Sequence, residues 1–422
     1  MDLLIRNISQ LVLATDKPPV FAASSAMVDM PVLENSYLLI SGDKIQAFGT
    51  MNDCPERAGQ VIDAGGRIVM PAFCDSHTHL VYAASREKEF VDRIKGLSYE
   101  EIALRGGGIL NSAKLLRNTT ENELYDLAMV RIAEIIYQGT GAVEIKSGYG
   151  LDTASELKML RVIRRIKETT TIEVKATFLG AHAVPAEYQG DQNGYVDLII
   201  RKMLPVIAAE KLAEFVDVFC DRGFFTPDNT ARILEASEKL GLIPKIHANE
   251  LEYSGGIQIG VRYHALSVDH LECTGEEEIR ILKDTATMPT LLPGAALFLG
   301  LPWPPARKMI DSGLPVALGS DFNPGSCPTG NMMLMIALAC INMKMLPEES
   351  LFASTLNSAY AMNLSGELGT LTPGKNANVI ITRPVPDYSY LPYAFGSDLV
   401  EKVIIKGKIL VNKESRYDQT TD

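Results

Sequence analysis

The sequence holds little of what extracellular, membrane-spanning or nucleic-acid-binding proteins require. Its six cysteines are scattered without a Cys-x-x-Cys pair, which argues against a disulfide framework and against a thiolate zinc site. The first residues lack the basic-then-apolar order of a signal peptide, and the most apolar run, Met332 to Met343, is too short to span a bilayer. The net charge of -12 disfavours general nucleic-acid binding, which needs a basic face. We therefore expect a cytoplasmic protein with no nucleic-acid or membrane partner.

Both ends of the chain are predicted to be rich in β-strands. A hairpin is indicated at 37–49, where apolar runs flank a Gly-Asp turn, and a second hairpin is indicated at 403–411. Strands at both ends, around a middle of different pattern, predict one small composite domain. We expect residues 1–67 and 370–422 to build this β-sandwich-like domain, and residues 68–369 to form a larger one.

The middle of the chain alternates short apolar strands with helical stretches, which is typical of a parallel α/β fold. Eight strands are expected, at residues 68–75, 141–146, 172–180, 215–221, 243–248, 265–271, 286–292 and 315–321. Eight such units within a chain of 422 residues predict a distorted TIM (β/α)8 barrel that carries the small β domain.

Reactive side chains gather where these strands are expected to end. His77 and His79 follow the first strand at a spacing of i, i+2, so both imidazoles can face one ion. The third, fifth, sixth and eighth strands are followed or ended by His182, His247, His270 and Asp321. Five of the six histidines lie at such positions, and only His264 does not. Because barrel enzymes build their sites at the carboxyl ends of the strands, the sequence predicts one shared site.

Five motifs along the chain resemble those of a known family. They are Phe73-Cys74-Asp75-Ser76-His77-Thr78-His79, Glu144-Ile145-Lys146-Ser147-Gly148-Tyr149-Gly150, Phe178-Leu179-Gly180-Ala181-His182, His247-Ala248-Asn249-Glu250 and Gly319-Ser320-Asp321-Phe322-Asn323-Pro324-Gly325-Ser326. In this order the chain resembles the metal-dependent amidohydrolase superfamily and, within it, the imidazolonepropionases. The resemblance covers essentially the whole chain.

The resemblance implies a site for a single metal ion, one Zn²⁺ or Fe ion per subunit. The implied ligands are His77, His79, His247 and Asp321. Imidazole and carboxylate accept either metal, and the metal lowers the pKa of water towards neutrality. Asp321 and His270 would handle the proton of the attacking water. Lys146 is expected to be a structural or supporting cation and not a carboxylated bridge between two metals.

The same resemblance implies contacts with an anionic substrate. Arg86 would clamp a carboxylate, because a guanidinium group pairs two donors with two oxygens. Glu250 would contact the substrate ring and pass a proton to the leaving nitrogen. Substrate contacts are implied for Arg86, Tyr149, His182, Glu250, Asn323, Gly325 and Ser326. Without the resemblance, an arginine in the local context of Arg86 is more often solvated than functional.

The activity implied by the resemblance is hydrolysis of the ring C–N amide bond of 4-imidazolone-5-propanoate to N-formimidoyl-L-glutamate, in histidine degradation, by a homodimer. Two alternatives remain open. A deaminase or cyclic amidase acting on a neutral heterocycle would share the metal ligands but would not need Arg86. A metal-binding scaffold without turnover would share the ligands and have no activity to lose on chelation.

Overall fold

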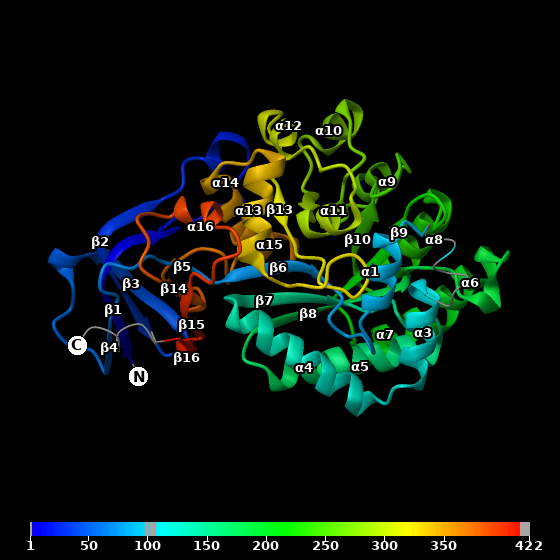
Figure 1. Ribbon diagram of the computed structural model, residues 1–422, viewed down its shortest axis with the longest axis horizontal. Helices are drawn as coiled ribbons and strands as arrows, with labels where there is room; N and C mark the ends of the chain where they lie inside the picture. Colours follow the sequence, from blue (N-terminus) through cyan, green and yellow to red (C-terminus); the bar gives the residue numbers. More distant parts are fainter. Residues whose placement is uncertain (1, 98–100, 102–106, 414–422) are drawn as a thin grey trace.

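The computed structural model describes residues 2–97, 101 and 107–413, whose strands form two separate sheets (Figure 1). One sheet is the expected parallel barrel. Its strands are β6 (Phe73–Thr78), β7 (Thr140–Lys146), β8 (Glu173–Ala181), β9 (Phe215–Cys220), β10 (Ile243–Ala248), β11 (Ser267–His270), β12 (Met288–Leu291) and β13 (Ala317–Leu318). They pair in chain order, so the TIM-type barrel predicted from the sequence is confirmed.

The barrel closes where its last strand meets its first. The Asp321 backbone N–H donates to the His77 carbonyl at 2.9 Å, and the His79 N–H donates to the Phe322 carbonyl at 3.0 Å. The Ser320 hydroxyl adds a bond of 2.5 Å to the Asp75 carboxylate. This seam places residues from the two ends of the barrel sequence in direct contact.

Helices cover the outside of the barrel. They are α1 (Glu87–Ile94), α3 (Gly108–Asn118), α4 (Glu121–Tyr137), α5 (Thr153–Thr169), α6 (Gln192–Leu198), α7 (Leu204–Glu210), α8 (Pro227–Glu238), α9 (Gly256–Arg262), α10 (Glu276–Leu282), α11 (Pro293–Leu299), α12 (Ala306–Asp311), α13 (Met332–Met343), α14 (Pro347–Ser354), α15 (Leu356–Ala361) and α16 (Tyr390–Tyr393). Shorter helical turns are η1 (Ser24–Met27), η2 (Met51–Asp53), η3 (Ala186–Tyr188) and η4 (Ile199–Met203).

Local sequence explains several helix ends. Thr120 and Glu123 form a reciprocal capping box at the start of α4, and the Asp152 carboxylate accepts the Ser155 N–H at the start of α5. α8 begins with Pro227, whose missing N–H costs nothing in the first turn of a helix. Of the helices described, none combines the length and the apolar composition needed to cross a membrane.

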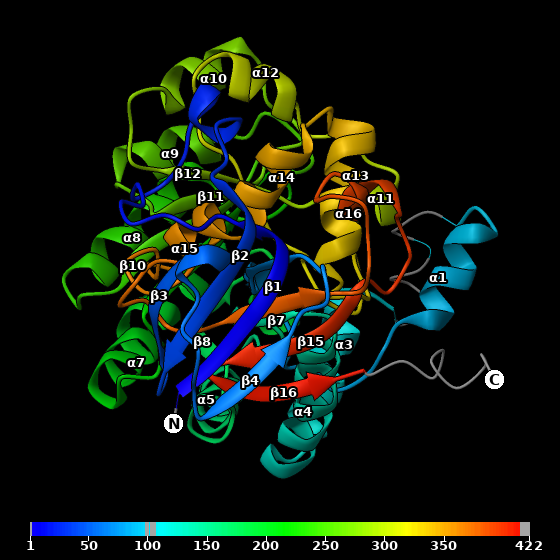
Figure 2. The same ribbon diagram turned by 90° about the vertical axis from the view of Figure 1, so that its left-hand side faces the viewer.

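The second sheet is built from both ends of the chain, as expected. Its strands are β1 (Asp2–Val12), β2 (Val32–Ser41), β3 (Lys44–Thr50), β4 (Gln60–Asp63), β5 (Val69–Pro71), β14 (Val379–Thr382), β15 (Val400–Ile405) and β16 (Lys408–Asn412). Their order is β16-β15-β14-β5-β1-β2-β3, with β4 paired to β1. Figure 2 turns this sheet towards the viewer, and β2–β3 and β15–β16 are the two predicted hairpins.

The first expected barrel strand, at 68–75, is instead two strands in different sheets. β5 pairs with β1 and β14, whereas β6 opens the barrel. Between them the Ala72 N–H donates to the Asn378 carbonyl at 2.9 Å, and the Phe73 N–H turns to the Gly139 carbonyl at 3.0 Å. An apolar run does not reveal which sheet its residues join, which explains the error. The division into residues 1–67 with 370–422 and residues 68–369 stays a prediction.

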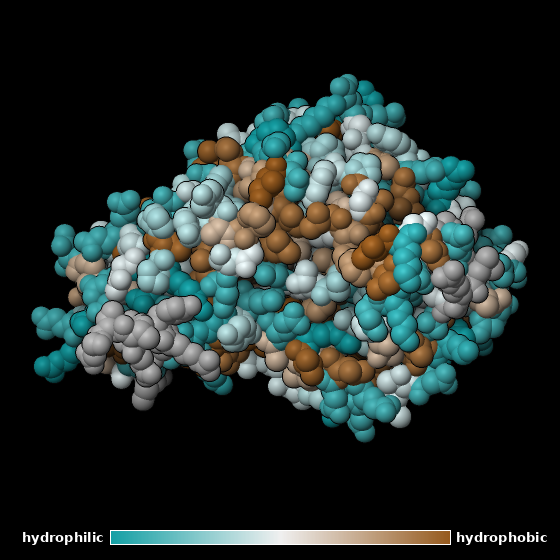
Figure 3. Space-filling view, in the orientation of Figure 1, coloured by the Kyte–Doolittle hydropathy of each residue, from teal (hydrophilic) through white to brown (hydrophobic). Residues whose placement is uncertain are grey.

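Each sheet has its own apolar core. Aliphatic side chains such as Ile5, Leu38 and Ile404 fill the terminal sheet, while a larger cluster packs the helices on the barrel. On the face drawn in Figure 3, apolar side chains gather over α13 and α11. The barrel interior near its mouth differs from both cores because it holds polar and charged side chains.

Candidate active site

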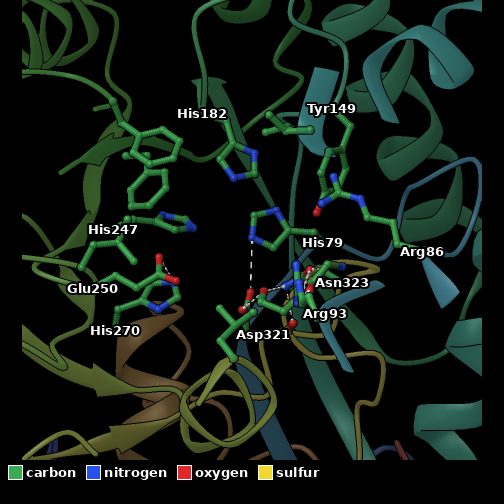
Figure 4. A pocket seen from close by; sticks show the side chains of 17 residues that line it. His79, Arg86, Arg93, Tyr149, His182, His247, Glu250, His270, Asp321 and Asn323 are labelled. Atoms are coloured by element: carbon green, nitrogen blue, oxygen red, sulfur yellow. Dashed lines mark hydrogen bonds and ion pairs between the residues drawn. The ribbon is translucent and has the colours of Figure 1, made fainter. Parts of the chain in front are cut away.

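The structure brings the histidines from separate strands together at the mouth of the barrel (Figure 4). One nitrogen each from His77, His79 and His247 lie within 4.8 Å of one another, and the same limit holds for ligand atoms of His77, His270 and Asp321. The Asp321 Oδ1 lies 3.5 Å from His77 Nε2 and 3.6 Å from His79 Nε2. Imidazoles and a carboxylate at such distances surround a space suited to one cation.

The unpaired atoms of the cluster fit a metal. Within the described part of the chain, His77 Nε2 and His247 Nε2 are buried and lack a hydrogen-bond partner. A buried polar atom without a partner is costly, and a metal ion would satisfy both. Burial, together with Lys146 and the surrounding histidines, holds the pKa of His77 and of His79 well below the usual value. Both rings are therefore neutral at pH 7, the form that coordinates a metal.

Two further charged groups lie beside the cluster. His270 lies between two carboxylates, with Nε2 at 3.6 Å from Glu250 Oε2 and Nδ1 at 3.7 Å from Glu272 Oε1. Burial alone would lower the pKa of His270, but Glu250 and Glu272 outweigh it and raise the pKa to about 10. Burial also raises the pKa of Glu250 to about 8, against the opposing effect of His270. At neutral pH, His270 is a cation and Glu250 carries a proton.

Strained backbone marks the same strand ends. Asp321 has a φ of 56° and His270 a φ of 82°, in the left-handed region that residues other than glycine seldom adopt. Each such residue costs about 1–3 kcal/mol, which persists where the surroundings dictate the conformation. The bonds of the barrel seam around Asp321 supply that constraint and direct its carboxylate at the histidines.

A cavity of about 460 Å³ opens above the cluster. His79, Glu250, His270 and Asp321 line one part of it, and Arg86 contributes to its wall as well. Arg86 immediately precedes α1, its Nε donates to the Ser112 hydroxyl at 2.9 Å, and its Cζ lies 5.9 Å from the centre of the Tyr149 ring. Figure 4 shows Arg86 and Tyr149 together, with His79 between them and His247. The cavity thus combines a metal-type cluster with a separate cationic group.

The loop after β13 lines one side of the cavity. The Asn323 Oδ1 accepts the N–H groups of Gly325 and Ser326 at 2.7 and 2.8 Å, and the Ser326 hydroxyl donates to Asp321 Oδ2 at 2.8 Å. A Cβ on Gly325 would lie only 2.6 Å from Arg86 Nη1. Glycine at this position therefore lets the guanidinium approach the loop.

A family model described as the amidohydrolase family matches residues 68–410. The chain belongs to the amidohydrolase family. The matched segment contains each of the predicted site residues, and the expected superfamily is thereby confirmed.

Curated relatives of this amidohydrolase match it along its length. An imidazolonepropionase of Christiangramia forsetii is 53% identical over 411 residues, covering 97% of this chain and 100% of the relative. Imidazolonepropionases of Flavobacterium johnsoniae and Geobacillus kaustophilus are 54% and 41% identical, covering 96% and 98% of this chain and 99% of each relative. The predicted resemblance to imidazolonepropionases is confirmed, and this amidohydrolase is a hydrolase.

Solved structures share the fold of this amidohydrolase at low sequence identity. Atrazine chlorohydrolase from Arthrobacter aurescens, complexed with zinc, is 19% identical with a TM-score of 0.73, covering 97% of this chain and 95% of that one. Guanine deaminase from E. coli is 15% identical with a TM-score of 0.74, covering 98% and 99%. At these identities the likeness concerns the fold alone. Together with the histidine cluster, the family supports a metal cofactor for this amidohydrolase.

The predicted site residues of the amidohydrolase share one region. Those lining the cavity are His79, Arg86, Tyr149, His182, His247, Glu250, His270, Asp321, Asn323, Gly325 and Ser326. His77 lies below them, fully buried. The His182 ring stacks on His79 with an angle of 18° between the planes, and its Nδ1 lies 3.1 Å from the Gly148 carbonyl oxygen. Proximity to the cluster does not assign a role, so the individual roles stay predictions.

The sequence analysis missed further cavity residues. Arg93 lines the cavity and donates from Nη1 to the Gly325 carbonyl at 3.0 Å. It lies within α1, seven residues after Arg86 at the start of that helix, and a helical reading of the segment would have indicated that the two side chains lie on one side. Phe219 and Phe224 form a stacked pair in the wall, with ring centres 4.0 Å apart. Phe219 follows Asp217 at the strand spacing that directs both side chains into the barrel.

Proposed function

We propose that this protein hydrolyses the ring C–N amide bond of 4-imidazolone-5-propanoate to N-formimidoyl-L-glutamate, a step of histidine degradation. One observation carries the proposal: the histidine cluster and Arg86 line the same cavity. A small molecule whose lactam carbonyl lies at the cluster can reach the guanidinium with a carboxylate. The identity to imidazolonepropionases over nearly the whole chain supports the same substrate.

The proposed metal site holds one zinc or iron ion per subunit. Its ligands are His77, His79, His247 and Asp321. The neutral rings and the unpaired Nε2 atoms of His77 and His247 support this assignment. When bound, the metal supplies a Lewis acid for the carbonyl and lowers the pKa of the attacking water.

The residues of the chain move the protons in this proposal. Asp321 accepts a proton from the attacking water, and the cationic His270 stabilises the negative charge that develops on the former carbonyl oxygen. The C–N bond then breaks, and Glu250 donates its proton to the leaving ring nitrogen. The raised pKa of Glu250, about 8, supports this role because a donor must be protonated at neutral pH.

The other end of the substrate is held by Arg86 and Tyr149. Arg86 offers a planar pair of donors to the propionate oxygens, and Ser112 fixes its Nε from behind at 2.9 Å. Burial raises the pKa of Tyr149, so its phenol stays a hydrogen-bond donor. A single local arginine is sufficient to favour an anionic substrate although the protein is acidic overall.

The test is an assay with 4-imidazolone-5-propanoate, following loss of its ultraviolet absorbance, with metal analysis of the same sample. We expect turnover that disappears on chelation and returns when zinc or iron is added. Turnover that survives complete removal of metal would refute the metal role. Metal binding without turnover of this compound, or of guanine and cytosine, would indicate a scaffold.

The rival activity is deamination or ring opening of a neutral heterocycle. The shared fold with guanine deaminase makes it worth testing, since fold similarity does not specify the substrate. Guanine and cytosine are assayed beside the carboxylate substrate. Faster turnover of a neutral base, unaffected by Arg86→Met, would favour the rival.

A homodimer in the cytoplasm completes the proposal. The assembly follows from the resemblance to imidazolonepropionases, and the cytoplasmic location from the cysteine usage and the sequence pattern. Sedimentation equilibrium of the purified protein at several concentrations tests the dimer, and cell fractionation tests the location. A monomer at micromolar concentration would contradict the first part.

A further inference from the structure

Charged side chains form a buried layer directly below the histidine cluster. The layer consists of Glu144, Lys146, Asp217, Lys245 and Asp269, and each is at most 1% exposed. Three carboxylates and two ammonium groups meet there, on the barrel strands β7, β9, β10 and β11. Buried charges are expensive, and apolar side chains of similar size often stabilise a protein more. A layer kept at such cost calls for a functional reason.

Two of the carboxylates contact candidate metal ligands. His77 Nδ1 and Asp269 Oδ2 form a hydrogen bond of 2.6 Å. Asp217 Oδ2 lies 2.9 Å from His247 Nδ1, and its Oδ1 accepts the His247 backbone N–H at 3.1 Å. In both rings Nδ1 therefore faces a carboxylate of the buried layer, and Nε2 faces the cavity. Such contacts fix the tautomer and the direction of a metal-binding imidazole.

Lys146 connects these two carboxylates. Its Nζ donates to Asp217 Oδ2 at 2.8 Å and lies 3.5 Å from Asp269 Oδ2, which are the two oxygens nearest the histidine rings. A third bond, of 2.6 Å, runs to Glu144 Oε1. Burial alone would lower the pKa of Lys146, but Asp217, Glu144 and Asp269 outweigh it and raise the pKa, so the ammonium group is charged.

We propose that Lys146 is a positioning residue of the metal site: its ammonium group holds Asp217 and Asp269 in place, and through them directs Nε2 of His247 and His77 at one shared metal ion. This inference rests on the proposed metal site. Without Lys146, the two buried carboxylates repel each other and turn away, and the rings lose their common direction.

Lys245 provides a matched control. It is fully buried like Lys146, and it also pairs with Glu144. Its other bonds go to the carbonyl oxygens of Ser76 and Ala361, at 3.2 and 3.1 Å. Among the described residues, it forms no ion pair with the carboxylates that contact histidines. Removing either lysine takes one positive charge out of the buried layer, but only Lys146 contacts the carboxylates beside the histidine rings.

The experiment titrates the metal-free protein with Co²⁺ and follows the visible absorption of the bound ion, which reports its coordination. We expect the wild type to bind one Co²⁺ per chain and Lys245→Met to bind with similar affinity despite lower thermal stability. Lys146→Met should bind about 10–100-fold more weakly, as is usual when an outer partner of a metal ligand is lost, with an altered spectrum. Equal affinity and spectrum in the two lysine variants would overturn the positioning role. Failure of the wild type to bind Co²⁺ would instead refute the metal site itself.

Further variants test whether Lys146 acts on the metal site through Asp217. If Lys146→Met does not fold, Lys146→Gln keeps a shorter donor at the same position and gives the same comparison. Because Lys146 acts partly through Asp217, the losses of Co²⁺ affinity in Lys146→Met and Asp217→Asn should not add in the double variant. Fully additive losses would show that the two residues act independently and would overturn the proposed link.

Discussion

The terminal sheet and the barrel mouth bury opposite kinds of side chain. The interior of the terminal sheet is aliphatic, with Ile5, Leu38 and Ile404 fully buried and paired across its strands. The barrel interior at the mouth instead buries charges and holds Asp321 and His270 in left-handed backbone. The first region stabilises the fold, whereas the second gives up stability to fix reactive groups. Mutations in the two regions should therefore have separable effects.

The largest effect is expected at Asp321. Asp321→Asn removes the proposed proton acceptor and should lower kcat by about 10²–10⁴-fold, the usual contribution of a positioned base. Thermal stability of the metal-free protein should change little, because the amide of asparagine has nearly the same shape as the carboxylate. Asp43→Asn, an exposed carboxylate in the turn between β2 and β3, is the control and should leave kcat unchanged. Steady-state kinetics and thermal melting of both variants check the contrast.

The reverse effect is expected in the terminal sheet. Leu38 is fully buried opposite Ile5 and Phe48, and Leu38→Ala should cost about 2–5 kcal/mol of unfolding free energy. Below the melting temperature, kcat/KM should equal that of the wild type. Denaturant unfolding measures the loss of stability. The kinetics are measured about 20 °C under the wild-type melting temperature, which is roughly outside the unfolding transition for a chain of this size. A loss of kcat without a loss of stability would break the separation of the two regions.

The pH dependence tests Glu250. A donor works only while protonated, and burial raises the pKa of Glu250 to about 8, so the proton is present at pH 7 and is lost as the pH rises through about 8. We expect kcat of the wild type to fall over that range. Glu250→Gln should be about 100-fold slower and should lack this fall. A pH–rate profile of both proteins tests this assignment. If kcat of the variant fell over the same pH range, the titrating group would be a residue other than Glu250.

The smallest effect is expected for Arg86. Arg86→Met removes a charged hydrogen-bonding group far from the broken bond, so KM should rise about 10–100-fold with a smaller change in kcat. Arg222→Met is the control, because Arg222 is mostly exposed and its side chain pairs, among the described residues, only with the half-exposed Glu252. An equal rise of KM in both variants would mean that net charge, and not the clamp, attracts the substrate.

The sequence was sufficient for the barrel and for the gathering of its histidines. Strand ends in a parallel barrel share one face, so His77, His247 and Asp321 were expected together although they lie far apart in the chain. The strand at 68–75 shows the limit, because its residues divide between two sheets whose partners lie near residues 140 and 380. Pairing partners are a property of the whole fold and do not appear in a local pattern.

The charged layer illustrates a second limit. Lys146 was expected to be a supporting cation, but its link to Asp217 and Asp269 depends on the stagger of separate strands. Sequence spacing gives the direction of a side chain within its own strand and not its height relative to another strand. Arg93 could have been predicted from the sequence. Its spacing from Arg86 is visible there, and only the expectation of a helix over that segment was lacking.

The position of β5 has a consequence for how the chain is made. β5 pairs with β1 on one side and with β14 on the other, so its second neighbour leaves the ribosome more than 300 residues after it. Until then its edge is open, and open strand edges recruit other chains. A product that stops short of Val379 would keep that edge bare permanently. Premature termination late in translation should therefore yield aggregates and not a shortened enzyme.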